Sequence, residues 1–67
     1  MEKIRDCEIR IGEFQNEVYV TYYNDKTEKI FSYYADELTF SSEEFLGLTK
    51  EQALNLFHKK DVEYLQN

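Results

Sequence analysis

The sequence has 67 residues, of which 42% are hydrophobic and 16% aromatic, and its formal net charge is −6 at pH 7. This length supports one domain, which we place over residues 1–67, and the apolar content exceeds that of a disordered acidic tail. The acidic balance disfavours direct binding to nucleic acid or to anionic membranes, because affinity for phosphate groups comes mainly from clustered Lys and Arg.

The N-terminal segment, residues 1–6, is charged at four of its six positions. Because it has no apolar run, we expect neither a signal peptide nor a membrane span, and we expect a cytoplasmic protein. The single cysteine, Cys7, cannot form an intrachain disulfide. It lies in a strand-like pattern, so we interpret it as a small buried hydrophobe rather than a reactive thiol or a metal ligand.

Three segments have the composition of β-strands. From Cys7 to Ile11 apolar residues alternate with charges, which is typical of a half-buried strand, and Gly12 ends the pattern. Val18 to Tyr23 is a run of β-branched and aromatic residues, and a similar run resumes from Lys29 to Ala35 after turn residues at 24–27. The short connections favour antiparallel hairpins.

A symmetric arrangement of the two hairpins predicts which residues face each other. It pairs Tyr23 with Glu28, Val20 with Phe31, Val18 with Tyr33, Ile11 with Val18, and Ile9 with Val20. The predicted core face then carries Cys7, Ile9, Ile11, Val18, Val20, Tyr22, Phe31 and Tyr33. The opposite face carries Glu8, Arg10, Tyr19, Thr21, Tyr23, Ile30, Ser32 and Tyr34. A slip of one residue would exchange the two faces of the slipped strand.

A C-terminal helix over residues 50–65 is predicted by a capping box and an apolar stripe. Thr49 and Gln52 have the spacing at which each side chain accepts a hydrogen bond from the backbone of the other. On a helical wheel the stripe consists of Ala53, Leu54, Phe57, Tyr64 and Leu65. The sequence therefore predicts an α+β fold, in which a three-stranded antiparallel β-meander packs against one C-terminal α-helix (β-β-β-α).

A second S-x-x-E box, at residues 41–44, predicts a short helical turn before this helix, with Gly47 ending it. The apolar residues around that glycine, Phe45, Leu46 and Leu48, are expected to close the end of the core.

Asp61 is the most unusual residue, because it falls inside the apolar stripe with His58 one turn earlier. A carboxylate there is costly unless it is hydrogen-bonded or paired. One interpretation is a His58/Asp61 site for proton transfer or a metal. The other is structural: the helix is slightly rotated, or Asp61 accepts hydrogen bonds from a Tyr hydroxyl or a backbone amide. We favour the structural interpretation, because no further residues are spaced to complete a metal site and no catalytic motif occurs. We therefore expect no enzyme activity and no cofactor.

Two groups of residues are candidates for binding a partner protein. The first is acidic: Asp36, Glu37, Glu43 and Glu44. It is either a solvated loop or an electrostatic docking surface for a basic protein. The second is the set on the sheet face that one helix cannot cover: Tyr19, Tyr23, Ile30 and Tyr34. These residues suit an interface or a homodimer contact, although aromatic pairs across strands can also simply stabilise a sheet.

The leading hypothesis for function is a small acidic protein-binding module that inhibits or modulates a partner with a basic surface, such as a nucleic-acid-binding protein. Small size, acidic charge and the absence of catalytic motifs are compatible with a phage or mobile-element origin. One alternative is a self-associating structural subunit that uses the tyrosine-bearing face. The other is the minimal His58/Asp61 site.

Overall fold

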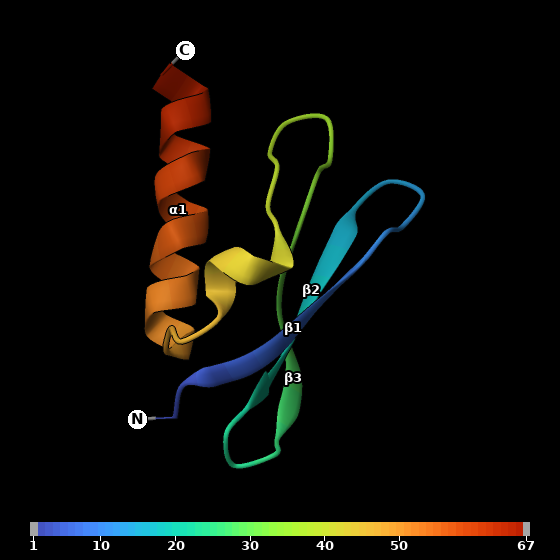
Figure 1. Ribbon diagram of the computed structural model, residues 1–67. Helices are drawn as coiled ribbons and strands as arrows, with labels where there is room; N and C mark the ends of the chain where they lie inside the picture. Colours follow the sequence, from blue (N-terminus) through green and yellow to red (C-terminus); the bar gives the residue numbers. More distant parts are fainter. Residues whose placement is uncertain (1, 67) are drawn as a thin grey trace.

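The computed structural model describes residues 2–66; Met1 and Asn67, the two ends of the expected domain, lie outside the described residues. It confirms the α+β, β-β-β-α architecture (Figure 1). Within the described residues the elements are β1 (Ile4–Arg10), β2 (Asn16–Tyr22), β3 (Thr27–Tyr33), the 3₁₀ helix η1 (Ser42–Phe45) and α1 (Lys50–Gln66). The strands form an open antiparallel sheet in the order β1-β2-β3.

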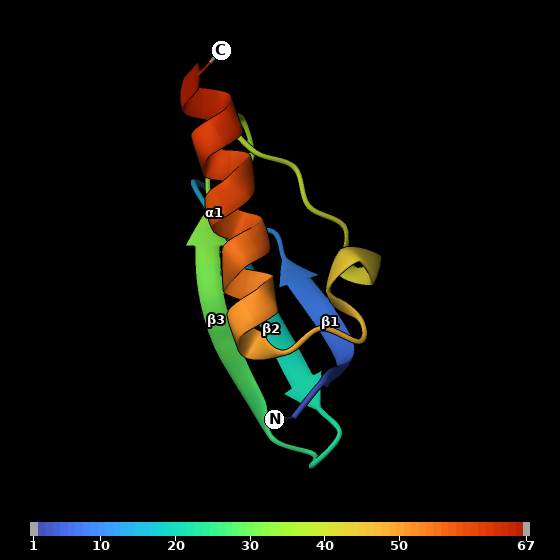
Figure 2. The same cartoon turned by 90° about the vertical axis from the view of Figure 1, so that its left-hand side faces the viewer.

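Both helices cover the same face of the sheet. Figure 2 shows α1 in front of β2 and β3, with η1 beside β1. The chain after η1 also pairs with the start of β1, because the Ile4 N–H donates to the Leu48 carbonyl at 2.7 Å and the Gly47 N–H donates to the Ile4 carbonyl at 2.9 Å. One sheet face is therefore closed, and none of the helices within residues 2–66 covers the other.

The expected strand pairings were wrong by two residues in the first hairpin. Ile9 pairs with Val18 and Cys7 with Val20, so β1 starts at Ile4 and ends at Arg10, and Ile11 lies in the following loop. Ile11, which was expected in the core, is 82% exposed. Because a shift of two residues preserves the side-chain alternation, Cys7 and Ile9 remain on the core face.

The second hairpin also departs from the expected pairing, and here the cause is a β-bulge. Val18 pairs with Phe31, but Tyr19 pairs with Lys29, so Ile30 is the extra residue on β3. A bulge reverses which face the following residues point to. Glu28 consequently pairs with Val20 rather than with Tyr23.

A similar irregularity in β1 explains a core residue that the alternation did not identify. Ile4 pairs with Tyr22 and Asp6 with Thr21, which leaves Arg5 as an extra residue. The extra residue brings Ile4 onto the core face, where it is fully buried.

Aromatic rings dominate the core between the sheet and the helices. Phe31 stacks on Phe57 of α1 with ring centroids 4.4 Å apart, and its ring lies 5.3 Å from that of Phe40. Phe40, which the strand and helix patterns did not identify, is buried, and its ring stacks on that of Phe45 at 5.7 Å. The segment between β3 and η1 therefore contributes to the core as well as connecting two elements.

The N-terminal end of α1 has the expected capping box. The Gln52 N–H donates to the Thr49 hydroxyl at 3.2 Å, and the Thr49 N–H donates to the Gln52 side-chain oxygen at 3.0 Å. Before η1, the Ser41 N–H donates to the Glu44 carboxylate at 2.7 Å. Gly47 has a φ of +83°, a conformation that favours glycine, and it ends this turn as expected.

Two expectations about the apolar residues near the helices were wrong. Leu46, expected to close the core with Phe45 and Leu48, is 46% exposed, whereas Phe45 is fully buried and Leu48 packs against the core cluster. The apolar stripe of α1 is buried only near its start: Ala53 is fully buried, whereas Leu65 is 73% exposed. The second half of α1 extends beyond the sheet (Figure 1).

Candidate functional site

The four residues expected on the uncovered sheet face do not form one patch. Tyr23 follows β2 and Tyr34 follows β3, and because these strands are antiparallel the two tyrosines lie at opposite ends of the sheet. Ile30 occupies the bulge and packs against the core cluster. Tyr19 therefore lies on that face without the other three.

The charged side chains nearest Tyr19 are paired with one another. The Arg10 guanidinium lies over the Tyr19 ring, 4.1 Å from its centroid, and also donates a hydrogen bond to Glu8. On the neighbouring strands Lys29 pairs with Glu17 at 2.9 Å. This face of the sheet is polar, and the charged groups nearest Tyr19 are paired with one another.

The acidic group is divided as well. Glu44 pairs with Lys60 of α1 at 2.7 Å, and the same ammonium donates to the Thr39 carbonyl at 2.8 Å. Burial raises the pKa of the Glu44 carboxyl, but hydrogen bonds from Lys60 and the Ser41 N–H more than offset this, so the pKa is lowered overall. Glu44 thus joins α1 to the segment before η1. Glu43 is exposed beside it, and Asp36 and Glu37 are exposed in the loop after β3.

Two surface hollows meet at Tyr34. The first is about 340 Å³ and is lined by Glu13, Phe14, Tyr34, Ala35 and Asp36. The second is about 220 Å³ and is lined by Ser32, Tyr33, Tyr34, Glu37, Leu38, Phe57 and Asp61. They are formed by the loop between β1 and β2, the loop after β3 and one turn of α1, which all lie toward the same end of the molecule (Figure 1). We call this region the acidic end and define it by Glu13, Phe14, Tyr34, Asp36, Glu37 and Asp61.

The acidic end combines exposed rings with uncompensated negative charge. Phe14 is 78% exposed and Tyr34 is 48% exposed. Within residues 2–66 none of its four carboxylates forms an ion pair, and neither hollow is lined by Lys, Arg or His.

The position of Asp61 explains why a carboxylate interrupts the apolar stripe. At this point α1 faces the second hollow rather than the closed core, so Asp61 is only partly buried. His58, one turn earlier, is exposed and does not line that hollow. Among the described residues no three His, Cys, Asp or Glu side chains are grouped so that they could hold a metal ion.

Cys7 packs against the core cluster and is partly buried. Burial, together with the neighbouring charge of Asp6, raises the pKa of its thiol to about 11. Near neutral pH it is therefore protonated and a poor nucleophile.

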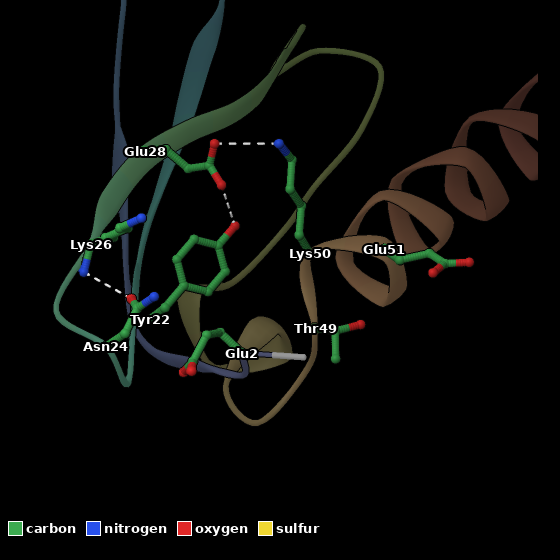
Figure 3. Close-up of a pocket in the computed structure, with 8 residues that line it drawn as sticks. All are labelled: Glu2, Tyr22, Asn24, Lys26, Glu28, Thr49, Lys50 and Glu51. Atoms are coloured by element: carbon green, nitrogen blue, oxygen red, sulfur yellow. Dashed lines mark hydrogen bonds and ion pairs between the residues drawn. The ribbon is translucent and has the colours of Figure 1, made fainter.

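A third hollow, of about 290 Å³, lies at the other end of the sheet beside the start of α1 (Figure 3). At its centre the Tyr22 hydroxyl donates to Glu28 at 2.6 Å, and Lys50 donates to the other oxygen of the same carboxylate at 3.3 Å. The hydrogen bond from Tyr22 and the Lys50 charge lower the pKa of the Glu28 carboxyl. These groups satisfy one another and join α1 to β2 and β3, so we assign this hollow a structural role.

Sequence reasoning identified three residues of the acidic end, Tyr34, Asp36 and Glu37, as partner-binding candidates. It noted Asp61 as unusual, but it missed Glu13 and Phe14. The available signal was an aromatic residue two positions after Gly12, outside either strand pattern and among polar neighbours. Such a residue in a loop indicates a packing or binding role.

Comparison of the chain with models of known protein families, with curated proteins and with solved structures finds no match. No helix within residues 2–66 combines the length and the apolar character required to cross a membrane.

Proposed function

We propose that this chain is a protein-binding module that acts, in the cytoplasm, as an inhibitor or modulator of a partner protein with a basic surface. The observation that carries the proposal is the acidic end, where exposed aromatic rings lie among four carboxylates that have no ion-pair partner within residues 2–66. Rings of this kind provide buried contact area in interfaces, and the surrounding charge attracts and orients a basic partner.

The contrast with the rest of the surface supports this choice of site. The uncovered sheet face and the hollow beside Lys50 hold both signs of charge, and in each of them a lysine is paired with a glutamate. In the described part of the chain, the charged side chains that line the two hollows of the acidic end are all carboxylates. A basic nucleic-acid-binding protein, whose phosphate-binding groove such a surface could occupy, fits this chemistry, whereas nucleic acid itself and anionic lipid do not.

The test is capture of proteins from lysate of the source cells at low and high salt with three forms of the chain. These are wild type, a triple variant of the acidic end (Glu13→Gln, Asp36→Asn, Glu37→Gln) and a matched triple variant elsewhere (Glu2→Gln, Glu43→Gln, Glu51→Gln). We expect one stoichiometric partner whose affinity falls about tenfold in the first variant, since three rim charges each contribute about 0.5 kcal/mol. It should change less than about threefold in the control. Equal losses in both variants, or binding insensitive to salt, would contradict the proposal.

A second candidate function, self-association as a structural subunit, is favoured by the outer edge of β3. Within residues 2–66 this edge has no backbone hydrogen bond to another segment, and an open strand edge can pair with a second copy. Sedimentation between micromolar and millimolar concentration tests it. A dimer would favour this candidate, and a monomer throughout the range would eliminate it.

A further inference from the structure

We propose that the hollow between Phe14 and Tyr34 is a binding pocket for a guanidinium group, taking one arginine side chain of a basic partner. The inference rests on the proposed function and deepens it, because it names the group that is recognised and the residues that recognise it.

The composition of the hollow suits this group. Two of its five lining residues are the aromatic Phe14 and Tyr34, two are the carboxylates Glu13 and Asp36, and the fifth is Ala35. A guanidinium is planar, carries a permanent charge and presents several N–H donors, so it can stack on a ring while donating to carboxylates. The volume of about 340 Å³ is sufficient for a single side chain of this size.

The same chemistry already occurs twice inside this chain, with the cation supplied internally. Arg10 lies over the Tyr19 ring and donates to Glu8. Lys60 lies 4.4 Å from the centroid of the Phe40 ring and pairs with Glu44. Each is a cation held between a ring and a carboxylate. The hollow at Phe14 presents rings and carboxylates with no Lys or Arg among its lining residues, so charge complementarity points to a cation from another molecule.

Backbone geometry positions both walls of the hollow. In the loop that carries Glu13 and Phe14, a Cβ at Gly12 would lie 2.3 Å from the Gln15 carbonyl oxygen, so the observed turn requires glycine there. On the other side, the Tyr34 carbonyl accepts hydrogen bonds from the N–H groups of Glu37 and Leu38, both at 3.0 Å. These two turns fix where the rings emerge from the backbone.

The first experiment is an NMR titration of the ¹⁵N-labelled full chain with the peptide acetyl-Gly-Arg-Gly-amide. The matched probe is the same peptide with citrulline, which keeps the planar shape of arginine but is neutral. We expect the arginine peptide to shift the amide signals of residues 13–15 and 34–36, and the citrulline peptide to leave them nearly unchanged. Equal shifts with both peptides, or arginine-induced shifts of equal size around Glu43 and Glu51, would overturn the assignment.

Variants separate the ring contribution from the charge contribution. Phe14→Ala should weaken arginine binding about two- to fivefold, which is the usual contribution of one cation–π contact at an exposed site. Glu13→Gln with Asp36→Asn should weaken it further and remove most of its salt dependence. Leu46→Ala, which truncates an exposed apolar residue elsewhere, is the control and should leave binding unchanged. Unaltered binding in Phe14→Ala would contradict a pocket formed by its ring.

The outcome for the pocket can be distinguished from the outcome for the proposed function. If a captured partner binds Phe14→Ala as well as wild type but loses affinity in the triple charge variant of the acidic end, and the arginine peptide fails to bind, the pocket assignment is wrong while the binding function stands. If the arginine peptide binds as expected but no partner is captured, the pocket stands and the proposed function is wrong.

Discussion

Phe57 is expected to be the main point at which α1 is held on the sheet. Its ring stacks on Phe31 with centroids 4.4 Å apart and an interplanar angle of 25°, and it lies 6.2 Å from the ring of Phe40. Truncating a fully buried Phe to Ala costs about 3–5 kcal/mol. Because Phe57 is partly exposed, we expect the free energy of unfolding to fall by about 2–3 kcal/mol in Phe57→Ala.

This loss is large for a chain of 67 residues, whose total stability is about 3–10 kcal/mol. With a urea m-value of about 1 kcal/mol per molar, the unfolding midpoint should fall by about 2–3 M. The transition can be followed by circular dichroism at 222 nm. Alanine is a better helix former than phenylalanine, so a loss of this size can be attributed to packing rather than to weakened helix propensity.

Leu65→Ala is the matched control. Leu65 belongs to the same apolar stripe in the sequence but is 73% exposed, so its truncation should change the free energy of unfolding by less than about 0.5 kcal/mol. If Leu65→Ala cost as much as Phe57→Ala, or if Phe57→Ala cost less than about 1 kcal/mol, the argument that only the first half of α1 is docked would be wrong.

Three further predictions follow from the capping box, the Tyr22–Glu28 pair and Cys7. Thr49→Ala should lower the free energy of unfolding by about 1 kcal/mol, because the Gln52 N–H loses the hydroxyl that accepts its hydrogen bond. Urea denaturation measures this loss, and an unchanged midpoint would contradict the capping role. Burial, and next the hydrogen bond to Glu28, raise the pKa of the Tyr22 hydroxyl above its ordinary value of 10.0. The folded chain therefore holds this proton more tightly than the unfolded chain. The contribution of the Tyr22 hydroxyl to the free energy of unfolding is complete below pH 10 and is lost as the pH rises further. Denaturation from pH 8 to 12 should show this decline, and Tyr22→Phe should reduce it; an equally steep decline in the variant would refute the assignment. At pH 7.5 the Cys7 thiol of the folded chain should react with a thiol-specific reagent much more slowly than a free cysteine, because its pKa is raised to about 11. In urea, where the chain is unfolded, it should react at the normal rate. A fast reaction of the folded chain would contradict this prediction, because it would show that the thiol is accessible and ionised.

Local sequence signals predicted the helix start and the fold class correctly. The reciprocal hydrogen bonds of Thr49 and Gln52 involve residues three apart, and the left-handed conformation of Gly47 is a property of a single residue. The fold class followed because the alternation in three short segments and their close spacing leave an antiparallel meander as the simplest arrangement.

The strand pairings could not be derived in the same way. Hairpin symmetry gives no indication of an extra residue, and the bulges at Arg5 and Ile30 exchange faces for only part of a strand. For this reason Ile4 was missed as a core residue, and Glu28 was not expected to meet Tyr22 and Lys50.

The sequence by itself determined the antiparallel meander, the capped helix and the acidic charge, because each depends on short-range spacing or on composition. Only the tertiary structure decided where α1 leaves the sheet, and therefore which half of its apolar stripe is buried and why Asp61 faces an open hollow. Only the tertiary structure brought Phe14 close to Tyr34 and Asp36, which lie about 20 residues later in the chain. The physical reason is that antiparallel pairing of β2 with β3 places the loop before β2 beside the loop after β3, and the exact pairing depends on bulges that no local pattern specifies.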